Sequence, residues 1–416
     1  MNNMNLICGL ISLLAVSMSF SANAEGDPKI GKTRAAICAG CHGHDGIGLG
    51  SEFPNLAGQK QPYLIKQLRA FRSGERVNPT MKAMASSLHE EDIKNITAYF
   101  SSLARSPLTP VTAKHAATIK ASRIEFPNTV YVTMKKSGTV ETFPDETVWS
   151  GGPNLLYNAL TPDGKMLLAT SPSSNSVYVF DAQSGHQLAV ILVGKAPKGV
   201  KVSPNGKFAY VSNQGSADVS VVALDSLKVV DTIKVEEGPH NVRFTRNGQL
   251  AYVTLQGGAG IGVIDTAQRK MVRVIPVPGI TGPHNMDLSP DESILYVRDF
   301  VHHVAVLELK SGNVKKVITV GNGHGGIDVS PDGRFVVTSA IGDDFVSVIN
   351  PKTFAVTNII VGNGPHGVRS SADGRWIYVT VTKDNLVAVI DTNTMQVVKK
   401  IAVGNFPFWI AVKNNQ

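Results

Sequence analysis

The pattern of hydrophobic and polar positions changes along the chain. Residues 6–20 form an apolar run, the stretch 90–103 repeats apolar residues at three- and four-residue steps, and short β-branched runs alternate with turn residues from position 127 onwards. Steps of three and four residues place side chains on one face of a helix, whereas short β-branched runs between turns are typical of strands. The pattern therefore predicts an apolar leader, a helical region and a β-rich region.

The apolar run is followed by small residues at Ala22 and Ala24, which fit an A-x-A cleavage site. The run is too short to span a bilayer comfortably, and no second long apolar segment follows it. We therefore expect residues 1–24 to be a signal peptide and the protein to be exported to the periplasm, with no transmembrane helix after cleavage. An uncleaved anchor is the alternative, because residues 1–24 contain no Lys or Arg.

The β-rich region repeats a turn whose fullest form is Ser-Pro-Asp-Gly. The last residues of successive copies are 42, 42, 44, 41 and 41 positions apart, and strand-like runs follow each copy. Four short strands in about 40 residues are typical of one propeller blade. The copies end at Gly164, Gly206, Gly248, Glu292, Gly333 and Gly374.

The segment 127–416 has room for seven such repeats of about 41 residues. It begins with the run 131–133, which lacks a preceding strand, and it ends with an additional strand at 408–412. We expect this last strand to complete the first blade as its innermost strand, because that arrangement removes an open sheet edge. Residues 105–126 include two prolines and show no clear period, and they are predicted to be a linker.

Three Tyr-Val-Thr sequences, which begin at Tyr131, Tyr252 and Tyr378, make this region similar to the YVTN-type β-propeller family. The resemblance covers nearly all of residues 127–416 and implies an all-β, seven-bladed propeller. Propellers of this type include both enzymes and plain scaffolds, so the resemblance is specific for fold and uninformative for function.

Composition and charge exclude several classes of protein. A chain of 416 residues is too long for one ordinary domain. With 43% hydrophobic and 17% charged residues, it is also too apolar to be disordered. The formal charge of +8 is spread along the chain without a block of like charge, so we expect no nucleic-acid partner. Three cysteines are too few for a disulfide framework, and Cys8 lies in the predicted signal peptide.

The other two cysteines stand in the sequence Cys38-Ala39-Gly40-Cys41-His42. Two thiols at this spacing can add to the two vinyl groups of one porphyrin, and the adjacent imidazole then meets the iron from one face. A redox dithiol would not require the histidine, and a zinc site would need more soft ligands than the chain offers. The motif predicts one covalent haem c on Cys38 and Cys41, with His42 as an axial ligand.

Residues 25–104 resemble class I cytochrome c, especially its small bacterial members. Besides the haem motif, the matching positions are 54–59, 63–68, 74–76, Met81 and 98–100. The resemblance implies a small all-α domain in which Met81 is the second axial ligand and Pro54 supports His42. It assigns Met84 to core packing. His44 and His89 are disfavoured as ligands, because His44 is too close to His42 and His89 lies at a predicted helix start.

A Met/His ligand pair raises the reduction potential of the iron and leaves no vacant position on it. We therefore expect this domain to pass electrons rather than to turn over a substrate. Residues 25–105 contain 11 basic and 8 acidic residues, which favours an acidic redox partner.

Six of the eleven histidines are predicted to gather at one end of the propeller. The eighth position before the end of each repeated turn lies in the loop that leads into the inner strand, and His240, His284 and His366 occupy it, each in a Gly-Pro-His sequence. The remaining polar residues expected at this end are Lys198, His302, His303 and His324.

These histidines leave two functional hypotheses and one structural alternative open. Converging imidazoles could hold a metal such as copper, or could ligate or flank a second haem, with His240, His284 and His366 as candidate catalytic residues. The alternative is that Gly-Pro-His, which is close to the consensus of the repeat, only orders the loop. Positive charge from Lys198, Arg243 and Arg298 near this face would suit an anionic substrate, but we expect these residues to be solvated instead.

A c-type cytochrome followed by a propeller is similar to the nitrite reductases that carry c-type and d-type haems, and to their relatives in d-type haem assembly. Those reductases have an eighth blade, whereas only seven are predicted here. Copper-containing propeller oxidoreductases are a second precedent. The resemblance implies an oxidoreductase that moves electrons between a redox partner and the propeller, where a small-molecule substrate would bind. A non-catalytic electron-transfer, binding or cofactor-assembly protein is the alternative function.

Overall fold

The computed structural model describes residues 26–43, 45–48, 53–103, 129–258 and 260–413. The predicted signal peptide, the predicted linker and His44 therefore lie outside the described residues. The chain divides into two compact units, one of Met1–Arg34 with Gln59–Ser102 and the other of Ala35–Gly58 with Leu103–Gln416, and each is described by itself. No helix in the described part of the chain has the length and apolar character needed to cross a membrane.

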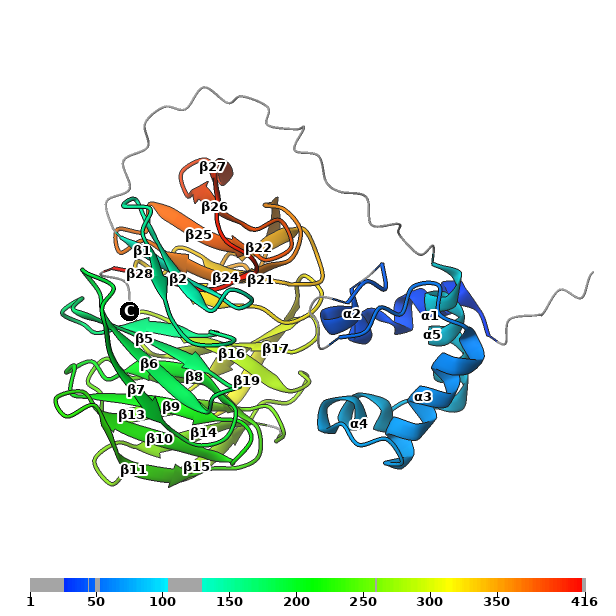
Figure 1. Ribbon diagram of the computed structural model, residues 1–416, viewed down its shortest axis with the longest axis horizontal. Coiled ribbons are helices and arrows are strands. Elements are labelled where there is room, and N and C mark those ends of the chain that lie inside the picture. The colour runs from blue at the N-terminus through cyan, green and yellow to red at the C-terminus, as the bar shows by residue number, and fades with distance from the viewer. Residues whose placement is uncertain (1–25, 44, 49–52, 104–128, 259, 414–416) are drawn as a thin grey trace, which may run out of the picture. The chain divides into compact units, whose positions relative to one another are not determined.

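The described helices all belong to the N-terminal quarter of the chain, which confirms the predicted all-α region (Figure 1). Helix α5 covers most of the stretch in which apolar residues recur at three- and four-residue steps, and Ile93, Ile96 and Phe100 on it are buried. Helix α1 packs against α5 so closely that a Cβ atom on Gly31 would lie 1.9 Å from the carbonyl oxygen of Asn95. The helices are α1 (Pro28–Arg34), α2 (Ala36–His42), α3 (Gln61–Ser73), α4 (Pro79–Ser86) and α5 (Glu90–Ser102).

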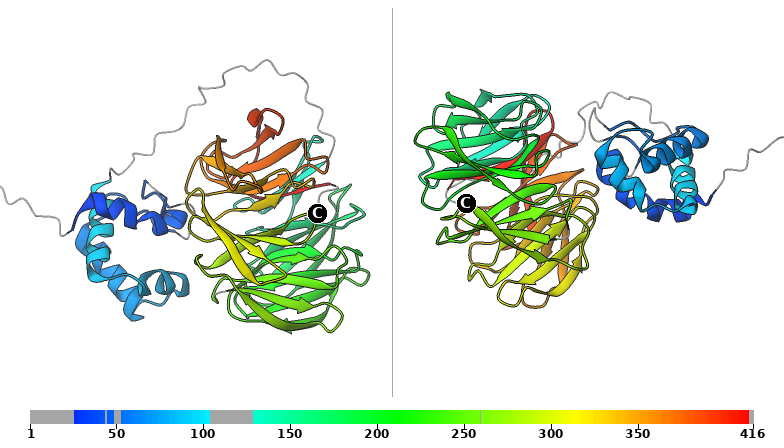
Figure 2. Two further views of the ribbon diagram at one scale, coloured as in Figure 1. Left: turned by 180° about the vertical axis from the view of Figure 1, so that it is seen from behind. Right: turned by 90° about the horizontal axis from the view of Figure 1, so that it is seen from below.

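The β-rich region forms seven antiparallel sheets of four strands each, which confirms the predicted seven-bladed propeller (Figures 1 and 2). Each innermost strand contacts the innermost strands of the two neighbouring blades, so the seven sheets close into a ring.

The strands of the first three blades, from innermost to outermost, are β28 (Pro407–Val412), β1 (Val130–Met134), β2 (Thr139–Phe143) and β3 (Val148–Ser150); β4 (Asn158–Leu160), β5 (Met166–Ser171), β6 (Ser176–Asp181) and β7 (Gln187–Leu192); and β8 (Pro197–Val202), β9 (Phe208–Asn213), β10 (Asp218–Ala223) and β11 (Lys228–Lys234).

The strands of the other four blades, in the same order, are β12 (Pro239–Phe244), β13 (Leu250–Leu255), β14 (Gly260–Asp265) and β15 (Lys270–Pro276); β16 (Pro283–Leu288), β17 (Ile294–Asp299), β18 (His303–Glu308) and β19 (Asn313–Thr319); β20 (Ile327–Val329), β21 (Val336–Ser339), β22 (Phe345–Ile349) and β23 (Val356–Ile360); and β24 (Pro365–Ser370), β25 (Trp376–Val381), β26 (Leu386–Asp391) and β27 (Gln396–Ala402).

The first blade is completed by the C-terminal strand, as predicted from the two ends of the repeat region. Strand β28 pairs antiparallel with β1, with Val130 opposite Val412 and Val132 opposite Ile410. This pairing joins the two ends of the β-rich region in one four-stranded sheet.

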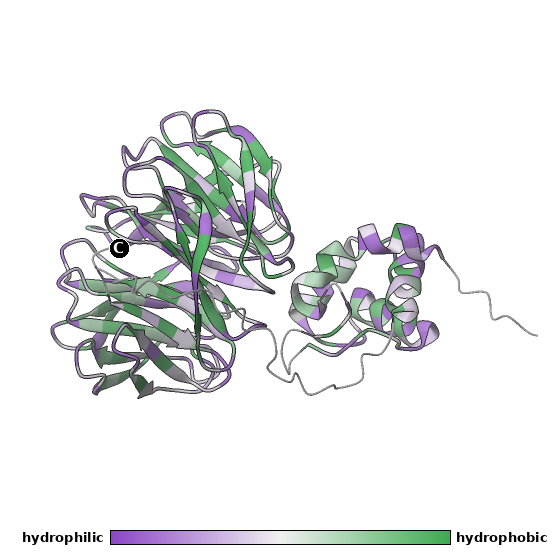
Figure 3. Cartoon of the chain, turned by 90° about the horizontal axis from the view of Figure 1, so that it is seen from above, coloured by the Kyte–Doolittle hydropathy of each residue, from purple (hydrophilic) through white to green (hydrophobic). Residues whose placement is uncertain are grey.

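The blades pack against each other through apolar side chains on both faces of their middle strands. Every residue of β10 is buried, and Val219 and Val221 pack toward the fourth blade while Val222 packs toward the second. Burying a valine side chain completely contributes roughly 1.5–3 kcal/mol, which explains the continuous apolar runs of the middle strands. The outermost strands are mostly exposed, and hydrophilic residues concentrate in the loops and outer edges of the blades (Figure 3).

The repeated turns have one hydrogen-bonding pattern, which explains their sequence. The hydroxyl oxygen of Thr161 accepts a hydrogen bond from the backbone N–H of Met166 at 2.9 Å, and that of Ser371 accepts from Trp376 at 2.9 Å. The glycine that ends five of the six turns has φ between +67° and +71°, a backbone conformation that favours glycine. Glu292 adopts a φ of +58° in the fifth blade, and its carboxylate accepts from the backbone N–H of Arg246 in the preceding blade.

Candidate haem site and histidine cluster

The side chain of His42 is held in one orientation by the backbone carbonyl of Pro54. His42 ends helix α2, is only 5% exposed, and places Nδ1 2.9 Å from the Pro54 oxygen. Burial lowers the pKa of His42, so the ring is neutral at pH 7 and Nδ1–H donates to the carbonyl. The lone pair of the neutral ring is then on Nε2, which is the atom that an axial ligand presents to iron.

Cys38 and Cys41 lie one helical turn apart on α2, so both thiols are on the same face of the helix. Burial, and to a smaller extent the neighbouring Cys41, raises the pKa of Cys38 to about 12. A redox-active dithiol needs a low thiol pKa, so this environment argues against that alternative. Two thiols with an adjacent neutral imidazole fit a covalent haem c.

The two candidate methionines lie on helix α4, which starts at a capped position. The side-chain oxygen of Asn78 accepts a hydrogen bond from the backbone N–H of Met81 at 2.9 Å. Met81 and Met84 are both half-buried, so burial alone does not separate an iron ligand from a packing residue. His89 is exposed just before α5.

The histidines of the Gly-Pro-His sequences occupy equivalent positions in the propeller, but these positions are in strands and not in loops. His240, His284 and His366 are the second residues of β12, β16 and β24, and Lys198 is the second residue of β8. A register shift follows the leading proline in each of these strands. The prediction of a loop was wrong because an irregularity of this kind lets the chain pair with its neighbour while it redirects one side chain.

The Gly-Pro-His histidines link neighbouring blades through one ring nitrogen. Nδ1 of His240 lies 3.0 Å from the carbonyl oxygen of His284, which also accepts from Thr254 Oγ1 at 3.0 Å. Nδ1 of His366 lies 2.9 Å from the carbonyl oxygen of Phe408, which accepts from Thr380 Oγ1 at 3.1 Å. His240 and His366 therefore have the structural role that the sequence left open as the alternative, because each orders the connection to the next blade. The shared carbonyl also explains why the threonine of Tyr-Val-Thr recurs.

The second ring nitrogens distinguish His240 from the other histidines. Nε2 of His240 lies 3.3 Å from the hydroxyl of Tyr157, so both of its nitrogens have partners. Nε2 of His284 and Nε2 of His366 are buried and lack a hydrogen-bond partner among the described residues. Nδ1 of His324 is likewise buried and without such a partner. Unpaired buried polar atoms are costly, so three of them in one place call for a ligand.

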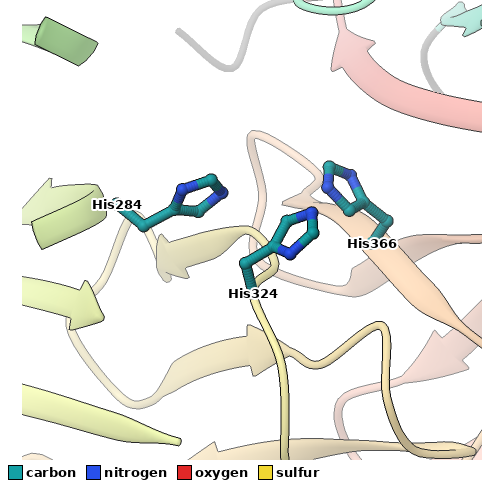
Figure 4. A group of neighbouring side chains, drawn as sticks. All are labelled: His284, His324 and His366. Carbon is teal, nitrogen blue, oxygen red and sulfur yellow. The ribbon is translucent and has the colours of Figure 1, made fainter. Parts of the chain in front are cut away.

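His284, His324 and His366 form the histidine cluster. One ring nitrogen from each lies within 4.8 Å of the others, and Figure 4 shows the three rings directed into one space from three consecutive blades. His284 and His366 are 2% and 0% exposed, and His324, in the segment before β20, is half-buried.

The histidine cluster is neutral at pH 7. Burial lowers the pKa of all three rings, that of His366 to about 4. The neighbouring imidazoles lower the pKa of His284 and His324 further, and Arg298 and Lys135 make smaller contributions. Neutral imidazoles keep a lone pair for a metal ion.

Aromatic rings and an amide that the sequence analysis did not identify complete the surroundings. Phe300 stacks on His324 with ring centres 4.8 Å apart, and Phe408 lies 4.0 Å from His366. The amide nitrogen of Gln256 lies 3.2 Å from Nδ1 of His284. Gln256 and Phe300 directly follow β13 and β17, and Phe408 is the second residue of β28.

His302 and His303 form a separate pair. Their rings are 4.0 Å apart, and Nδ1 of His303 lies 3.0 Å from the carboxylate of Asp299. They precede and begin β18, and neither belongs to the group of three whose nitrogens lie within 4.8 Å of one another.

Of the three cations that were expected to be solvated, Arg298 is fully buried and Arg243 is half-buried, and both form ion pairs. Arg298 is 0% exposed and pairs with Asp299 at 3.2 Å, while it donates to the carbonyl oxygens of Gly321 and Gly323. Arg243 pairs with the buried Asp287 at 2.5 Å. The expectation was wrong because the ring of blades supplies carboxylates and carbonyls from neighbouring strands. Lys198 is half-buried.

A family model described as "Cytochrome c" matches residues 29–104, and two propeller models, "YNCE-like beta-propeller" and "Lactonase, 7-bladed beta-propeller", match residues 159–292 and 228–406. Fold and site thus define a cytochrome c domain followed by a seven-bladed propeller. The domain binds haem c covalently and transfers electrons.

Through its N-terminal domain the chain belongs to the cytochrome c family. Cytochrome c-554(548) of Halomonas halodenitrificans is 42% identical over 80 residues, which cover 18% of this chain and 96% of that protein. Cytochrome c4 of Pseudomonas aeruginosa is 39% identical over 90 residues, 22% of this chain, and the match spans 45% of that relative, less than half of its length.

The propeller resembles solved structures in fold. A chain of Kuenenia stuttgartiensis hydrazine synthase superposes with a TM-score of 0.57 at 22% identity, and the match covers 64% of this chain and 92% of that chain. At this level of identity the similarity concerns the fold alone.

Proposed function

We propose that this protein is an exported, periplasmic oxidoreductase that moves electrons between a redox partner and a redox site at the histidine cluster of its propeller. The observation that carries the proposal is the histidine cluster itself. Three rings with buried, unpartnered nitrogens occur in a chain whose other domain is an electron-transfer cytochrome. Three unpaired nitrogens gathered in one place favour a bound group over a purely structural role.

In this proposal Cys38 and Cys41 attach the haem, and His42 and Met81 ligate its iron. A bound haem c supplies one-electron exchange at a potential raised by the Met/His pair. Pro54 holds the His42 ring in the orientation that leaves Nε2 available. Asn78 fixes the start of the helix that carries Met81.

The redox partner is proposed to be an acidic protein, and the substrate a small molecule. Basic residues exceed acidic ones in residues 25–105, by 11 to 8. A complementary charge would speed the encounter, most of all at low salt. Export is supported by the apolar run at residues 6–20 and the small residues after it.

The experiment that tests this function follows one electron after it enters the haem. The full chain is first oxidised, so that the histidine cluster site can accept an electron. A flash-generated reductant then reduces the haem without oxygen, and haem absorbance reports its reoxidation. We expect a reoxidation phase whose rate does not change with protein concentration, because the electron moves within one chain. The phase is expected to persist in His186→Ala, a variant of an exposed histidine, and to vanish in His324→Gln.

Reoxidation that is entirely second order in protein concentration would contradict the proposal. The haem would then exchange electrons only with other molecules, and the propeller would have a non-catalytic binding role.

A further inference from the structure

The three orphaned nitrogens of the histidine cluster point to a metal ion of a particular kind. We propose that His284, His324 and His366 bind one copper ion, each through one ring nitrogen, and that this ion is resident mainly as Cu(I). This proposal deepens the proposed function, on which its redox role rests, because it names the redox centre of the propeller.

The geometry suits one ion shared by three rings. Three nitrogens bound to one ion at about 2 Å lie roughly 3.5 Å apart, so nitrogens within 4.8 Å of one another need to approach by about 1 Å. Small rotations of the side chains supply such a movement. The rings of His284 and His366 each contact that of His324 edge to face, with centres 4.9 and 5.2 Å away. Rings in contact leave no gap for a porphyrin among them, so a single ion fits and a second haem does not.

The surroundings already orient two of the three ligands. The Phe408 carbonyl accepts from Nδ1–H of His366, which places the lone pair of the neutral ring on the orphaned Nε2. Gln256 orients His284 in the same way when its amide oxygen, rather than its nitrogen, faces Nδ1, because the oxygen then accepts from Nδ1–H and the lone pair is on Nε2. Gln214 lies on the far side of Gln256 and exchanges a hydrogen bond of 2.6 Å with it, so both amides can turn together.

The donor set and the charge around it favour copper in its monovalent state. Imidazole nitrogens suit copper, zinc, iron and nickel alike, so the ligands alone do not choose between them. Among the described residues the hydrogen-bond partners of the three rings are the amide of Gln256 and the carbonyl of Phe408, and no carboxylate pairs with any of the rings. The cost of burying an uncompensated ion grows with the square of its charge, so a monovalent ion costs about a quarter as much as a divalent one.

The apolar rings beside the histidine cluster also favour the monovalent state of copper. Phe300, Phe408 and Trp409 contact its imidazoles and lower the local polarity. A poorly solvated site disfavours the more highly charged state, so the Cu(II)/Cu(I) potential is raised. One electron leaves ferrous haem iron, which becomes ferric, and reduces Cu(II) to Cu(I) in the same chain, with no bond made or broken.

Metal analysis of the full haem-containing chain tests the proposal. The protein is stripped with a chelator, incubated with Cu(I) under anaerobic conditions in competition with a colorimetric Cu(I) chelator, and assayed for copper, zinc and iron. We expect one copper per haem iron in the unmodified chain and in His186→Ala. Affinity for Cu(I) is expected to fall at least roughly tenfold in His324→Gln, since one of three ligands is removed.

His324→Gln is the variant of choice, because the described hydrogen bonds between blades use the Nδ1 atoms of His240 and His366 and not His324. Circular dichroism checks its fold. If it does not fold, electron paramagnetic resonance of the oxidised unmodified chain decides instead, since Cu(II) bound by three imidazoles shows nitrogen hyperfine splitting. Equal copper affinity in folded His324→Gln, zinc binding without copper, a second haem iron, or a Cu(II) signal without nitrogen splitting would each overturn the proposal.

The outcome is separable from that of the proposed function. If copper binds at the histidine cluster but no first-order haem phase occurs, the metal site is supported and electron transfer between that site and the haem is refuted. If a first-order phase occurs in a copper-free chain, electron transfer between the haem and the propeller is supported and the copper proposal is refuted.

Discussion

Asp299→Asn is expected to be among the most destabilising single substitutions in the propeller, with a loss of about 3–5 kcal/mol in the free energy of unfolding. Asp299 is 0% exposed and pairs with the fully buried Arg298. Its Oδ1 atom also accepts from the backbone N–H groups of residues 301, 302 and 303 at 3.0, 2.8 and 2.7 Å. Removal of the charge leaves a buried guanidinium without its anion, which is far more costly than loss of an exposed ion pair.

Urea unfolding followed by circular dichroism measures this loss. The matched control is Asp332→Asn, because Asp332 pairs with Arg334 at the surface, where both side chains are nearly half exposed. The control is expected to lose less than about 1 kcal/mol. If Asp299→Asn lost no more than the control, the carbonyls of Gly321 and Gly323 would be sufficient partners for Arg298.

Met81→Ala is expected to have the largest effect on the haem. Loss of the thioether ligand should abolish the thioether-to-iron absorption band of the oxidised protein. It should also lower the reduction potential by a sizeable part of the roughly 0.8 V that axial ligands can span. Visible absorption and a potentiometric titration of the full chain measure both effects.

Met84→Ala is the matched control, since Met84 lies one turn further along α4 and is half-buried like Met81. It is expected to keep the band and the potential. A band that survives in Met81→Ala and disappears in Met84→Ala would assign the ligand to Met84 instead.

The architecture could be predicted from sequence because its signals are local and repeated. Each Ser/Thr-x-Asp/Asn turn closes with the same hydroxyl-to-backbone bond, so the repeat of about 41 residues follows directly from turn chemistry. The closing strand β28 was predictable from an unpaired run at each end of the repeat region. The all-α domain was predictable from the haem motif and the apolar face of α5.

The chemistry of the propeller site could be predicted only in part. The Gly-Pro-His count found His284 and His366, but sequence does not tell which ring nitrogens have partners. His240 has two, one of them the hydroxyl of Tyr157, 83 residues away in the chain. His324 joins the cluster although it departs from the pattern by one residue. Arg298 was misjudged for a related reason, since its partners Gly321 and Gly323 lie more than 20 residues away and share no motif with it.

The central claim is that this chain holds a second one-electron centre besides its haem, and a reductive titration counts those centres most directly. The oxidised, copper-loaded full chain is titrated with a one-electron reductant while haem absorbance is recorded. The account predicts two electrons per chain, of which only one changes the haem spectrum, and one electron per chain after a chelator has removed the copper. Uptake of a single electron by the unmodified chain, matched throughout by haem reduction, would contradict it.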